Sequence, residues 1–372
     1  MDGFDRFISH DWQTPGWRKV LSLLIQSGWR SMLIWWAIGT AVSFFLCMVD
    51  VLPLFYKSEA RILGFQSVLP MGCWVTLGGA ISAVGGLLLS MYNPFGSPSC
   101  FLDAACICQT DDLLMQKGIY NIGGCLSVST NLHVLLSRHY FSRLWCVFEL
   151  SAYRKLNPSG RIILTPIHVE AFAANIYIWL HACGLLLVVF RASYDQGGIT
   201  VLLMFAFVAT VLLPLSHSFR QRSLDWQQIM ADLDNFDVMD VQCRNDFDRQ
   251  YIYAAIRSWY GSLDAFSEYV RGPFRQEVRV PLLVPFKYHC VLSTPMLSVS
   301  LDYMLGLLKA GIPLRSLLAY TLSVPVALNL LWCPAAISLM VFACEQLPKR
   351  SFNGSLYTQT TVISLAMLAL YI

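Results

Sequence analysis

The sequence predicts a multi-pass α-helical membrane protein that also carries a folded α/β unit outside the lipid. Of its 372 residues, 56% are hydrophobic and only 13% are charged, against about 25% charged in an average soluble domain. Charged residues disappear over long windows and return in blocks, as they do in a chain that alternates between lipid and water. Between the apolar windows, short runs typical of strands and amphipathic helices indicate the α/β unit.

The apolar windows predict six membrane spans and a seventh candidate. A spanning helix needs about 20 mainly apolar residues, because the hydrocarbon core is about 30 Å thick and each residue rises about 1.5 Å. The six windows are 31–49, 70–91, 171–190, 198–215, 316–344 and 356–372. The seventh window, 289–308, contains Asp302, so a helix lying in the membrane interface remains the alternative. If this helix does span, Asp302 either lines an ion or substrate path or bonds to a neighbouring helix.

The distribution of basic residues predicts the orientation of an integral membrane protein. With a cytosolic N-terminus, segments 1–30, 92–170, 216–288 and 345–355 face the cytosol and hold 21 of the 26 Lys and Arg residues. This arrangement follows the positive-inside rule. The first thirty residues are also too charged for a cleavable signal peptide. The predicted organisation is therefore 1–30 and 92–170 as parts of the α/β unit, 31–91 and 171–215 as transmembrane hairpins, 216–288 as a further cytosolic segment, and 289–372 as a C-terminal transmembrane bundle.

Charge and cysteine content exclude several classes of protein. A net charge of +3 without a dense basic run argues against nucleic-acid binding. The twelve Cys residues follow no regular framework, which favours reduced thiols over a disulfide scaffold. Cys100, Cys106, Cys108 and His10 match no established zinc-site spacing, so no metal is predicted.

The soluble segments predict a parallel sheet flanked by helices. Strand candidates alternate with helix candidates, which is the pattern of a parallel α/β fold. The strand candidates are Phe4–Ser9, Cys100–Asp103, Asn131–Ser137 and Arg161–Ile167, and the helix candidates are Gly16–Gly28, Lys117–Leu126 and a helix from Arg143 capped by Ser142. Both ends of a membrane hairpin return to the same side, so we expect Phe4–Ser9 to lie beside Asn131–Ser137 in a sheet split by that hairpin.

Three further patterns predict packing. Leu144, Phe148 and Ala152 recur at helical spacing and are expected to face a core. Phe236–Cys243 is strand-like and precedes a helix at Asp246–Tyr260, so this segment is a candidate for the fifth strand of the sheet. In the second span, Gly78, Ser82 and Gly86 recur every four residues, which lets another helix approach closely, either within the chain or in a dimer.

The middle of the chain resembles the TIR (Toll/interleukin-1 receptor homology) family. The stretch NLHVLLSRHYFSRLWCVFELSAYRK, followed by RIILTPI, is similar to the third strand, third helix and fourth strand of that family. The matching positions are Ser137, Tyr140, Ser142, Trp145, Cys146, Glu149, Leu150, Pro166 and Ile167. FDRFISHDW and CFLD resemble the first and second strands, and the chain also resembles multi-pass membrane proteins of dinoflagellates and related protists. The resemblance implies a flavodoxin-like parallel sheet.

The resemblance also implies a site. Some TIR domains cleave the nicotinamide–ribose bond of NAD with a glutamate of the third helix, which corresponds here to Glu149. A carboxylate beside the ribose stabilises the oxocarbenium-like transition state. Ser9, His10, Asp11 and Trp12 follow the first strand, where parallel sheets bind ligands, and Trp12 or Trp145 is expected to stack on a base. The alternative is that Glu149 only pairs with Arg143 or Arg154 in a scaffold without enzyme activity.

Two functional hypotheses follow. The first is a membrane-anchored signalling or scaffold module that acts through self-association or partner binding of the TIR-like unit, with NAD as a possible substrate and no certain cofactor. The second is a channel or transporter whose cytosolic TIR-like unit is regulatory. Both have the lipid bilayer as a partner.

Overall fold

The computed structural model describes residues 3–92, 98–193, 198–278, 285–346, 360–362 and 364. The chain divides into two compact units. Unit 1 comprises Met1–Ser22, Asn93–Glu170 and Leu224–Val280, and unit 2 comprises Leu23–Tyr92, Ala171–Ser223 and Pro281–Ile372. Each unit is therefore assembled from three segments that are far apart in the sequence.

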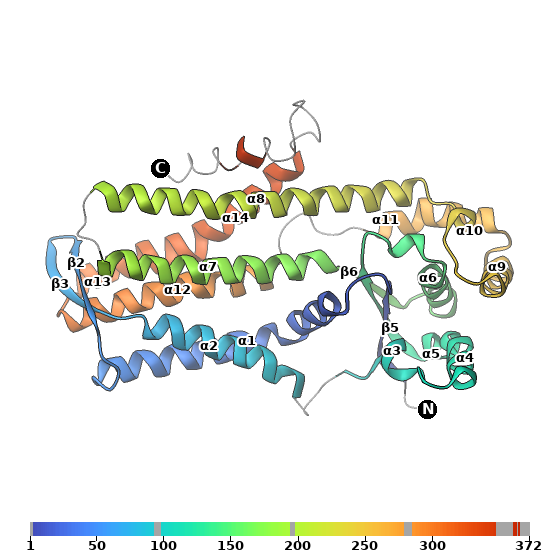
Figure 1. Cartoon of the computed structure of the whole chain (residues 1–372), viewed down its shortest axis with the longest axis horizontal. Helices are drawn as coiled ribbons and strands as arrows, with labels where there is room; N and C mark the ends of the chain where they lie inside the picture. The colour runs from blue at the N-terminus through green and yellow to red at the C-terminus, as the bar shows by residue number, and fades with distance from the viewer. Residues whose placement is uncertain are drawn as a thin grey trace. The chain divides into compact units, whose positions relative to one another are not determined.

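A four-stranded parallel sheet organises unit 1 (Figure 1). Its strands are β1 (Phe4–His10), β4 (Cys100–Phe101), β5 (Ser129–Leu136) and β6 (Arg161–Pro166), in the spatial order β4-β1-β5-β6. Phe4 pairs with Ser129 and His10 with Leu135, so the predicted pairing of the first strand with Asn131–Ser137 is confirmed. In order of their appearance in the unit, the strands lie as 2-1-3-4, which is the order of a flavodoxin-like sheet up to its fourth strand.

Short helices surround this sheet. They are α3 (Asp103–Cys106), α4 (Asp112–Tyr120), α5 (Ile122–Ser127), η2 (Tyr140–Ser142), α6 (Leu144–Leu156), η3 (Val238–Asp240), α9 (Asp246–Tyr260), α10 (Leu263–Tyr269), η4 (Val270–Phe274) and α11 (Arg275–Glu277). Leu144, Phe148 and Ala152 of α6 are buried, as the helical spacing predicts. The helix predicted at Asp246–Tyr260 is confirmed as α9, with the Asn245 side chain accepting from the Phe247 N–H at its start.

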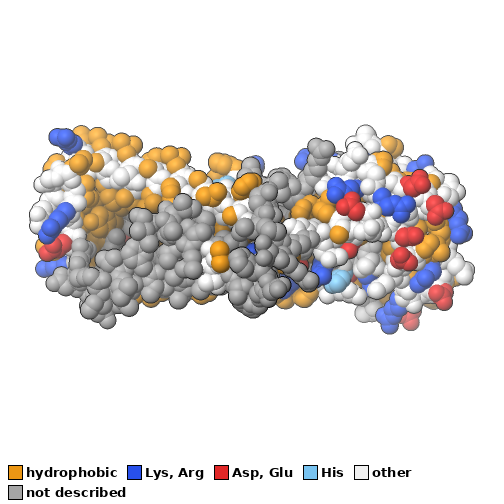
Figure 2. All heavy atoms as spheres, turned by 90° about the horizontal axis from the view of Figure 1, so that it is seen from above, with side chains coloured by type: hydrophobic (Ala, Val, Ile, Leu, Met, Phe, Trp, Pro, Cys, Tyr) orange, Lys and Arg blue, Asp and Glu red, His pale blue; other side chains and the backbone are white. Residues whose placement is uncertain are grey.

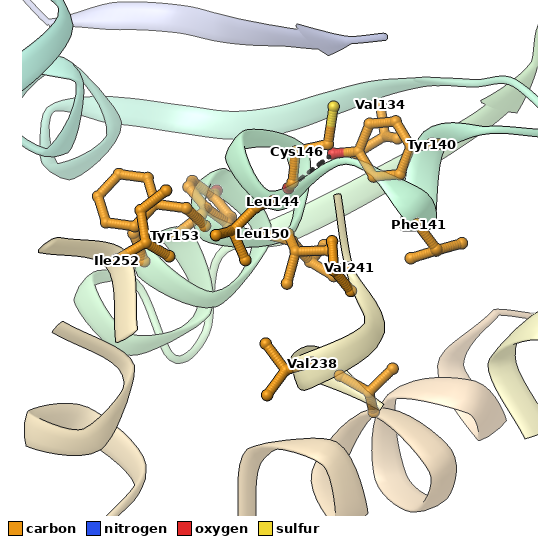
Figure 3. Packing of buried hydrophobic residues seen from close by; sticks show 14 of the residues in the cluster. Val134, Tyr140, Phe141, Leu144, Cys146, Leu150, Tyr153, Val238, Val241 and Ile252 are labelled. Atoms are coloured by element: carbon orange, nitrogen blue, oxygen red, sulfur yellow. Dashed lines mark hydrogen bonds between the residues drawn. The ribbon is translucent and has the colours of Figure 1, made fainter. Parts of the chain in front are cut away.

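The segment predicted as a fifth strand is not a strand. The Asp237 side chain accepts a hydrogen bond from the Met239 N–H, which turns the chain into the 3₁₀ helix η3. Only Gln242 forms a strand-like bridge, with Arg143. Val238 and Val241 are instead buried below α6, as Figure 3 shows. The alternation of apolar residues thus fills the core and does not extend the sheet.

Ser142 does not cap α6. Its hydroxyl donates to the His139 carbonyl oxygen (2.8 Å), because Ser142 belongs to the 3₁₀ turn η2. The residue that precedes the helix is Arg143, and α6 begins at Leu144. The predicted cap was therefore wrong, although the predicted helix is present.

Unit 2 consists mainly of long apolar helices and one β-hairpin. Its elements are α1 (Gly16–Met48, which begins in unit 1), β2 (Tyr56–Ile62), β3 (Phe65–Met71), α2 (Trp74–Leu89), η1 (Ser90–Tyr92), α7 (Ile167–Ser193, which begins in unit 1), α8 (Gly198–Asp234, which ends in unit 1), α12 (Phe286–Lys309), α13 (Leu314–Thr321), η5 (Leu322–Trp332) and α14 (Cys333–Gln346). In Figure 2, hydrophobic side chains cover the described helix surfaces of this unit, and charged side chains gather on unit 1 and at the hairpin end of unit 2.

Five candidate membrane spans occur among the described residues. They are Gly16–Met48, Trp74–Tyr92, Ile167–Phe190, Phe286–Lys309 and Leu314–Cys344. These helices include most of the predicted windows 31–49, 70–91, 171–190, 289–308 and 316–344. The predicted window 198–215 lies in α8, whose side chains are not described over this window, and 356–372 falls outside the described residues except at 360–362 and 364. Helices of this length and composition indicate an integral membrane protein.

Small residues bring α1 and α2 into close contact. The Ser31 hydroxyl donates to the Gly86 carbonyl oxygen (2.8 Å). A Cβ atom added to Gly78 would collide with Ser43, and one added to Gly39 would collide with Ser82. The small residues that recur along the second span therefore serve helix packing within the chain.

Asp302 of α12 is buried and bonds to a neighbouring helix. Its carboxylate accepts from the Val75 N–H (3.0 Å), the Thr76 N–H (2.9 Å) and the Thr76 hydroxyl (2.6 Å). Asp302 thus caps the N-terminus of α2 from another helix, where unpaired N–H groups and the helix dipole favour a carboxylate.

Candidate functional site

Glu149 lies in the second turn of α6 with its side chain buried at the sheet. The Ser9 hydroxyl, at the end of β1, lies 2.5 Å from Glu149 Oε2 and donates to it. The Tyr140 hydroxyl lies 2.6 Å from Ser9 Oγ and also donates to the Cys146 carbonyl oxygen (3.3 Å), the contact dashed in Figure 3. The strand therefore fixes the position of the glutamate through one short chain of hydroxyl groups.

Burial changes the acid strength of this glutamate. Desolvation raises the pKa of Glu149 to about 8, although the Ser9 hydrogen bond acts in the opposite direction and the Asp103 charge adds a smaller increase. The carboxyl group is therefore mostly protonated at pH 7. A protonated carboxyl both donates and accepts hydrogen bonds, and a cation bound beside it would favour its ionised form.

A cavity of about 420 Å³ opens in front of Glu149. This volume is within the range of small-molecule sites. The lining residues come from all three segments of unit 1: His10, Asp11, Trp12, Asp103, Ile107, Gln109, Met115, Ile119, Ile122, Arg143, Leu144, Trp145, Cys146, Glu149, Gln242, Cys243, Arg244 and Asp248. Five of the six predicted site residues line the cavity, and the sixth, Ser9, holds Glu149 without lining it. Their predicted roles remain predictions.

His10 and Trp12 form one wall together with Asp103. The Trp12 indole N–H donates to Asp103 Oδ2 (2.8 Å), and His10 Nδ1 lies 3.6 Å from Asp103 Oδ1. The His10 and Trp12 rings stack at 6.0 Å between their centroids. Burial is the main cause that lowers the pKa of His10, which favours the neutral imidazole. Trp12 remains 60% exposed, so its ring is accessible to a ligand.

Asp11 is fully buried and orders the loop after β1. Its carboxylate accepts from the Gln13 N–H (3.0 Å) and the Ser137 hydroxyl (3.3 Å), and Arg143 Nε lies 4.0 Å away. Because Ser137 follows β5, these contacts join the ends of two adjacent strands. Asp11 therefore positions the loop after β1, and its carboxylate oxygens are already engaged by these groups of the chain.

Trp145 and Asp248 complete the opposite side of the cavity. The Trp145 indole N–H donates to Asp248 Oδ2 (3.3 Å), and its ring packs edge-on against Phe148. Asp103 and Asp248 were not among the predicted site residues. Asp103 ends the predicted CFLD strand, which placed an acid at the ligand-binding edge of the sheet, whereas no local pattern distinguished Asp248.

The arginine pairs proposed as an alternative for Glu149 do not form among the described residues. Arg154 pairs with Glu277 (2.5 Å), and Arg143 lies nearest to Asp11. The same residues contain no cluster of three or more His, Cys, Asp or Glu side chains able to hold a metal ion. Among the described contacts, the Glu149 carboxyl therefore bonds to Ser9, and Glu149 also lines the cavity.

Comparison of the chain with protein-family models, with curated proteins and with solved structures found no match in any of the three. The interpretation of the site therefore depends on its geometry and chemistry.

Proposed function

We propose that the chain is a membrane-anchored signalling module whose TIR-like unit 1 binds a nucleotide, with NAD as the ligand and substrate. The observation that carries this proposal is the position of Glu149. Its carboxyl group faces a ligand-sized cavity and is held by Ser9 from the end of β1. A carboxyl in this position is suited to contact the ribose next to a scissile glycosidic bond.

The place of the cavity in the sheet supports a nucleotide. In open parallel sheets, ligands bind beyond the carboxyl ends of the strands, at the point where the strand order reverses. Here the chain order reverses at β1, which lies between β4 and β5. His10, Asp11 and Trp12 end or follow β1 and line the cavity at this point.

The chemistry of the walls supports a flat, cationic base attached to a sugar. The exposed ring of Trp12 and the partly buried ring of Trp145 offer stacking surfaces, and Asp103 and Asp248 offer carboxylate oxygens for hydroxyl groups. The positive charge of a nicotinamide ring would lower the pKa of Glu149 on binding. The ionised glutamate would then stabilise the positive charge that develops on the ribose as nicotinamide leaves.

The apolar helices of unit 2 support the anchoring part of the proposal. Five of them have the length and composition of membrane spans. The excess of Lys and Arg in the segments that form unit 1 supports a cytosolic position for this unit. Self-association or partner binding by unit 1 would then transmit the signal. We do not propose the channel or transporter hypothesis, because Asp302, the candidate residue for an ion or substrate path, has its carboxylate bonded to the start of α2.

The test uses the full chain in lipid nanodiscs incubated with NAD, with free nicotinamide as the readout. We expect Glu149→Gln to lower nicotinamide release at least about 100-fold, as for loss of a catalytic carboxyl. Glu268→Gln is the matched control, because Glu268 is exposed on α10 and does not line the cavity.

Titration of NAD binding to the same preparations separates binding from cleavage. We expect Trp12→Ala to weaken binding because it removes a stacking surface. If the wild-type chain neither binds NAD nor releases nicotinamide above the Glu149→Gln level, the nucleotide part of the proposal is wrong.

A further inference from the structure

Unit 2 contains a second, independent cavity of about 500 Å³. Its walls come from α12, from the continuous α13–η5 helix, from α7 and from the β2 strand of the hairpin. The lining residues are Arg61, Ile62, Leu187, Met296, Val299, Ser300, Tyr303, Tyr320, Ser323, Val324, Leu328 and Asn329. The volume is that of a small-molecule site, and none of these residues takes part in the Glu149 site.

Two helix faces form the long walls of this cavity. On α12, lining positions recur from Met296 to Tyr303 at intervals of three and four residues, which places them on one face. On α13 and η5, the positions from Tyr320 to Leu328 recur in the same way. Because seven residues of a helix rise about 10 Å, the cavity is an elongated slot. Half of its lining side chains are aliphatic or Met, which suits an extended hydrocarbon chain.

A buried polar group lies at one end of the slot. Asn329 of η5 is only 3% exposed, and its amide N–H groups donate to Ser300 Oγ (2.6 Å) and to the Met296 carbonyl oxygen (3.3 Å). These contacts use the donors of the amide. Among the described contacts its oxygen has no donor, so it is an available acceptor on a side chain that lines the cavity. Polar side chains within membrane helices are costly and commonly mark ligand sites.

A cationic group lies at the other end. Arg61 belongs to β2, and its side chain is 73% exposed; the nearest carboxylate oxygen, of Glu59, is 3.7 Å away. An exposed pair of this length is weak, so the guanidinium remains available to an anion. In the topology expected from the sequence, this hairpin lies on the side of the membrane opposite the cytosol.

The helix that carries Asn329 is irregular along the slot. Leu322–Trp332 has π-helical geometry over eleven residues and contains Pro325. π-helical turns interrupt the regular backbone hydrogen bonds of an α-helix, and they occur frequently at functional sites. Here the altered turn lies along the slot and includes Asn329, which faces Ser300 of α12.

We propose that this cavity binds an amphipathic carboxylic acid whose distal end carries a hydroxyl group. The carboxylate pairs with Arg61, the aliphatic body occupies the slot between α12 and η5, and the hydroxyl donates to the amide oxygen of Asn329. The two polar ends fix the orientation of the ligand, and the length of the slot selects a medium-length chain. This site gives the membrane part of the protein a ligand of its own.

The experiment measures binding of labelled 10-hydroxydecanoate and of labelled decanoate to the full chain in nanodiscs, with empty nanodiscs subtracted. We expect saturable binding and a three- to tenfold preference for the hydroxylated acid, which is about the effect of one hydrogen bond. Arg61→Gln should weaken binding of both acids about tenfold. Lys57→Gln, on the same strand but outside the cavity, should leave both unchanged.

Two variants inside the slot complete the test. Asn329→Leu should abolish the preference for 10-hydroxydecanoate while decanoate still binds, because only the acceptor for the hydroxyl is lost. Val324→Trp should block both acids by filling the cavity, and it keeps the test valid if Asn329→Leu does not fold. The proposal is wrong if the wild-type chain shows no saturable binding, or if Arg61→Gln and Lys57→Gln have equal effects. It is also wrong if Val324→Trp binds both acids as well as the wild type, or if a folded Asn329→Leu chain keeps the preference for 10-hydroxydecanoate.

Discussion

Glu149 in unit 1 and Asp302 in unit 2 are both buried carboxyl residues, yet their surroundings use them differently. Asp302 accepts three hydrogen bonds from two adjacent residues of α2. Glu149 accepts one short hydrogen bond from Ser9, and it lines a cavity. A buried carboxylate whose acceptor positions are filled by the fold stabilises structure, whereas one that is held on one side and faces a cavity remains available to a ligand.

The largest expected effect concerns Asp302. Replacing it with Ala leaves two buried N–H groups at the start of α2 without their acceptor, so we expect a loss of about 3–5 kcal/mol in the free energy of unfolding. Asp302→Asn keeps one acceptor oxygen and should lose about half as much. Denaturant unfolding of the full chain in micelles measures both. Equal stability of the Ala variant and the wild type would show that the comparison between the two carboxyl groups is wrong.

The second prediction concerns the pH dependence that Glu149 confers on unit 1. The pKa of Glu149 is about 8 in the folded chain and about 4.5 in the unfolded chain. Between pH 4.5 and pH 8, the folded chain therefore binds one proton more than the unfolded chain. Stability should therefore fall as pH rises through this window, by about 3 kcal/mol at most between pH 5 and 7.5. Glu149→Gln should remove this dependence and be the more stable chain at pH 7.5.

Hydrogen exchange of the α6 amides in nanodiscs measures this local stability as a function of pH. Glu268→Gln again serves as the control and should keep the wild-type slope. Parallel pH profiles for the wild type and Glu149→Gln would mean that the carboxyl is already ionised in the folded chain.

The smallest expected effect concerns the packing of α2, the helix whose N-terminus Asp302 caps. A Cβ atom at Gly78 collides with Ser43, whereas one at Gly85, on the same helix, meets no atom within 4 Å. Gly78→Ala should therefore cost about 1–3 kcal/mol through overpacking. Gly85→Ala should be neutral or stabilising by up to about 1 kcal/mol, because Ala is the better helix former. Melting temperatures in nanodiscs compare the two, and identical shifts would contradict close packing of α1 on α2.

The parts of the fold predicted from sequence are those with a strong local pattern. The pairing of Phe4–Ser9 with Asn131–Ser137 was predicted because both are strand candidates and the membrane hairpin between them returns the chain to the same side. The helix at Asp246–Tyr260 was predicted because its pattern is amphipathic and Gly261 follows it. The five candidate spans were predicted because each is a long window of apolar composition, which lipid requires of a spanning helix.

The parts that were missed either lack a recognisable turn sequence or depend on contacts between distant segments. The β2–β3 hairpin turns at Leu63-Gly64, both with positive φ, although Leu rarely adopts that conformation and does not indicate a tight turn. Phe236–Cys243 has the alternation of a strand, yet Val238 and Val241 fill a core formed by other segments. Asp248 reaches the cavity only because α9 packs against α6, and no local pattern reports such packing.

The position of β1 in the sheet has a consequence for biogenesis. This strand is synthesised before α1 and α2, but both of its neighbours, β4 and β5, are synthesised after them. Its backbone N–H and C=O groups therefore lack their partners in the sheet while α1 and α2 leave the ribosome and insert. Any factor that shields the nascent strand during this interval would determine the yield of folded protein. A tag fused next to Phe4 would disturb the middle of the sheet, because β1 lies between two other strands.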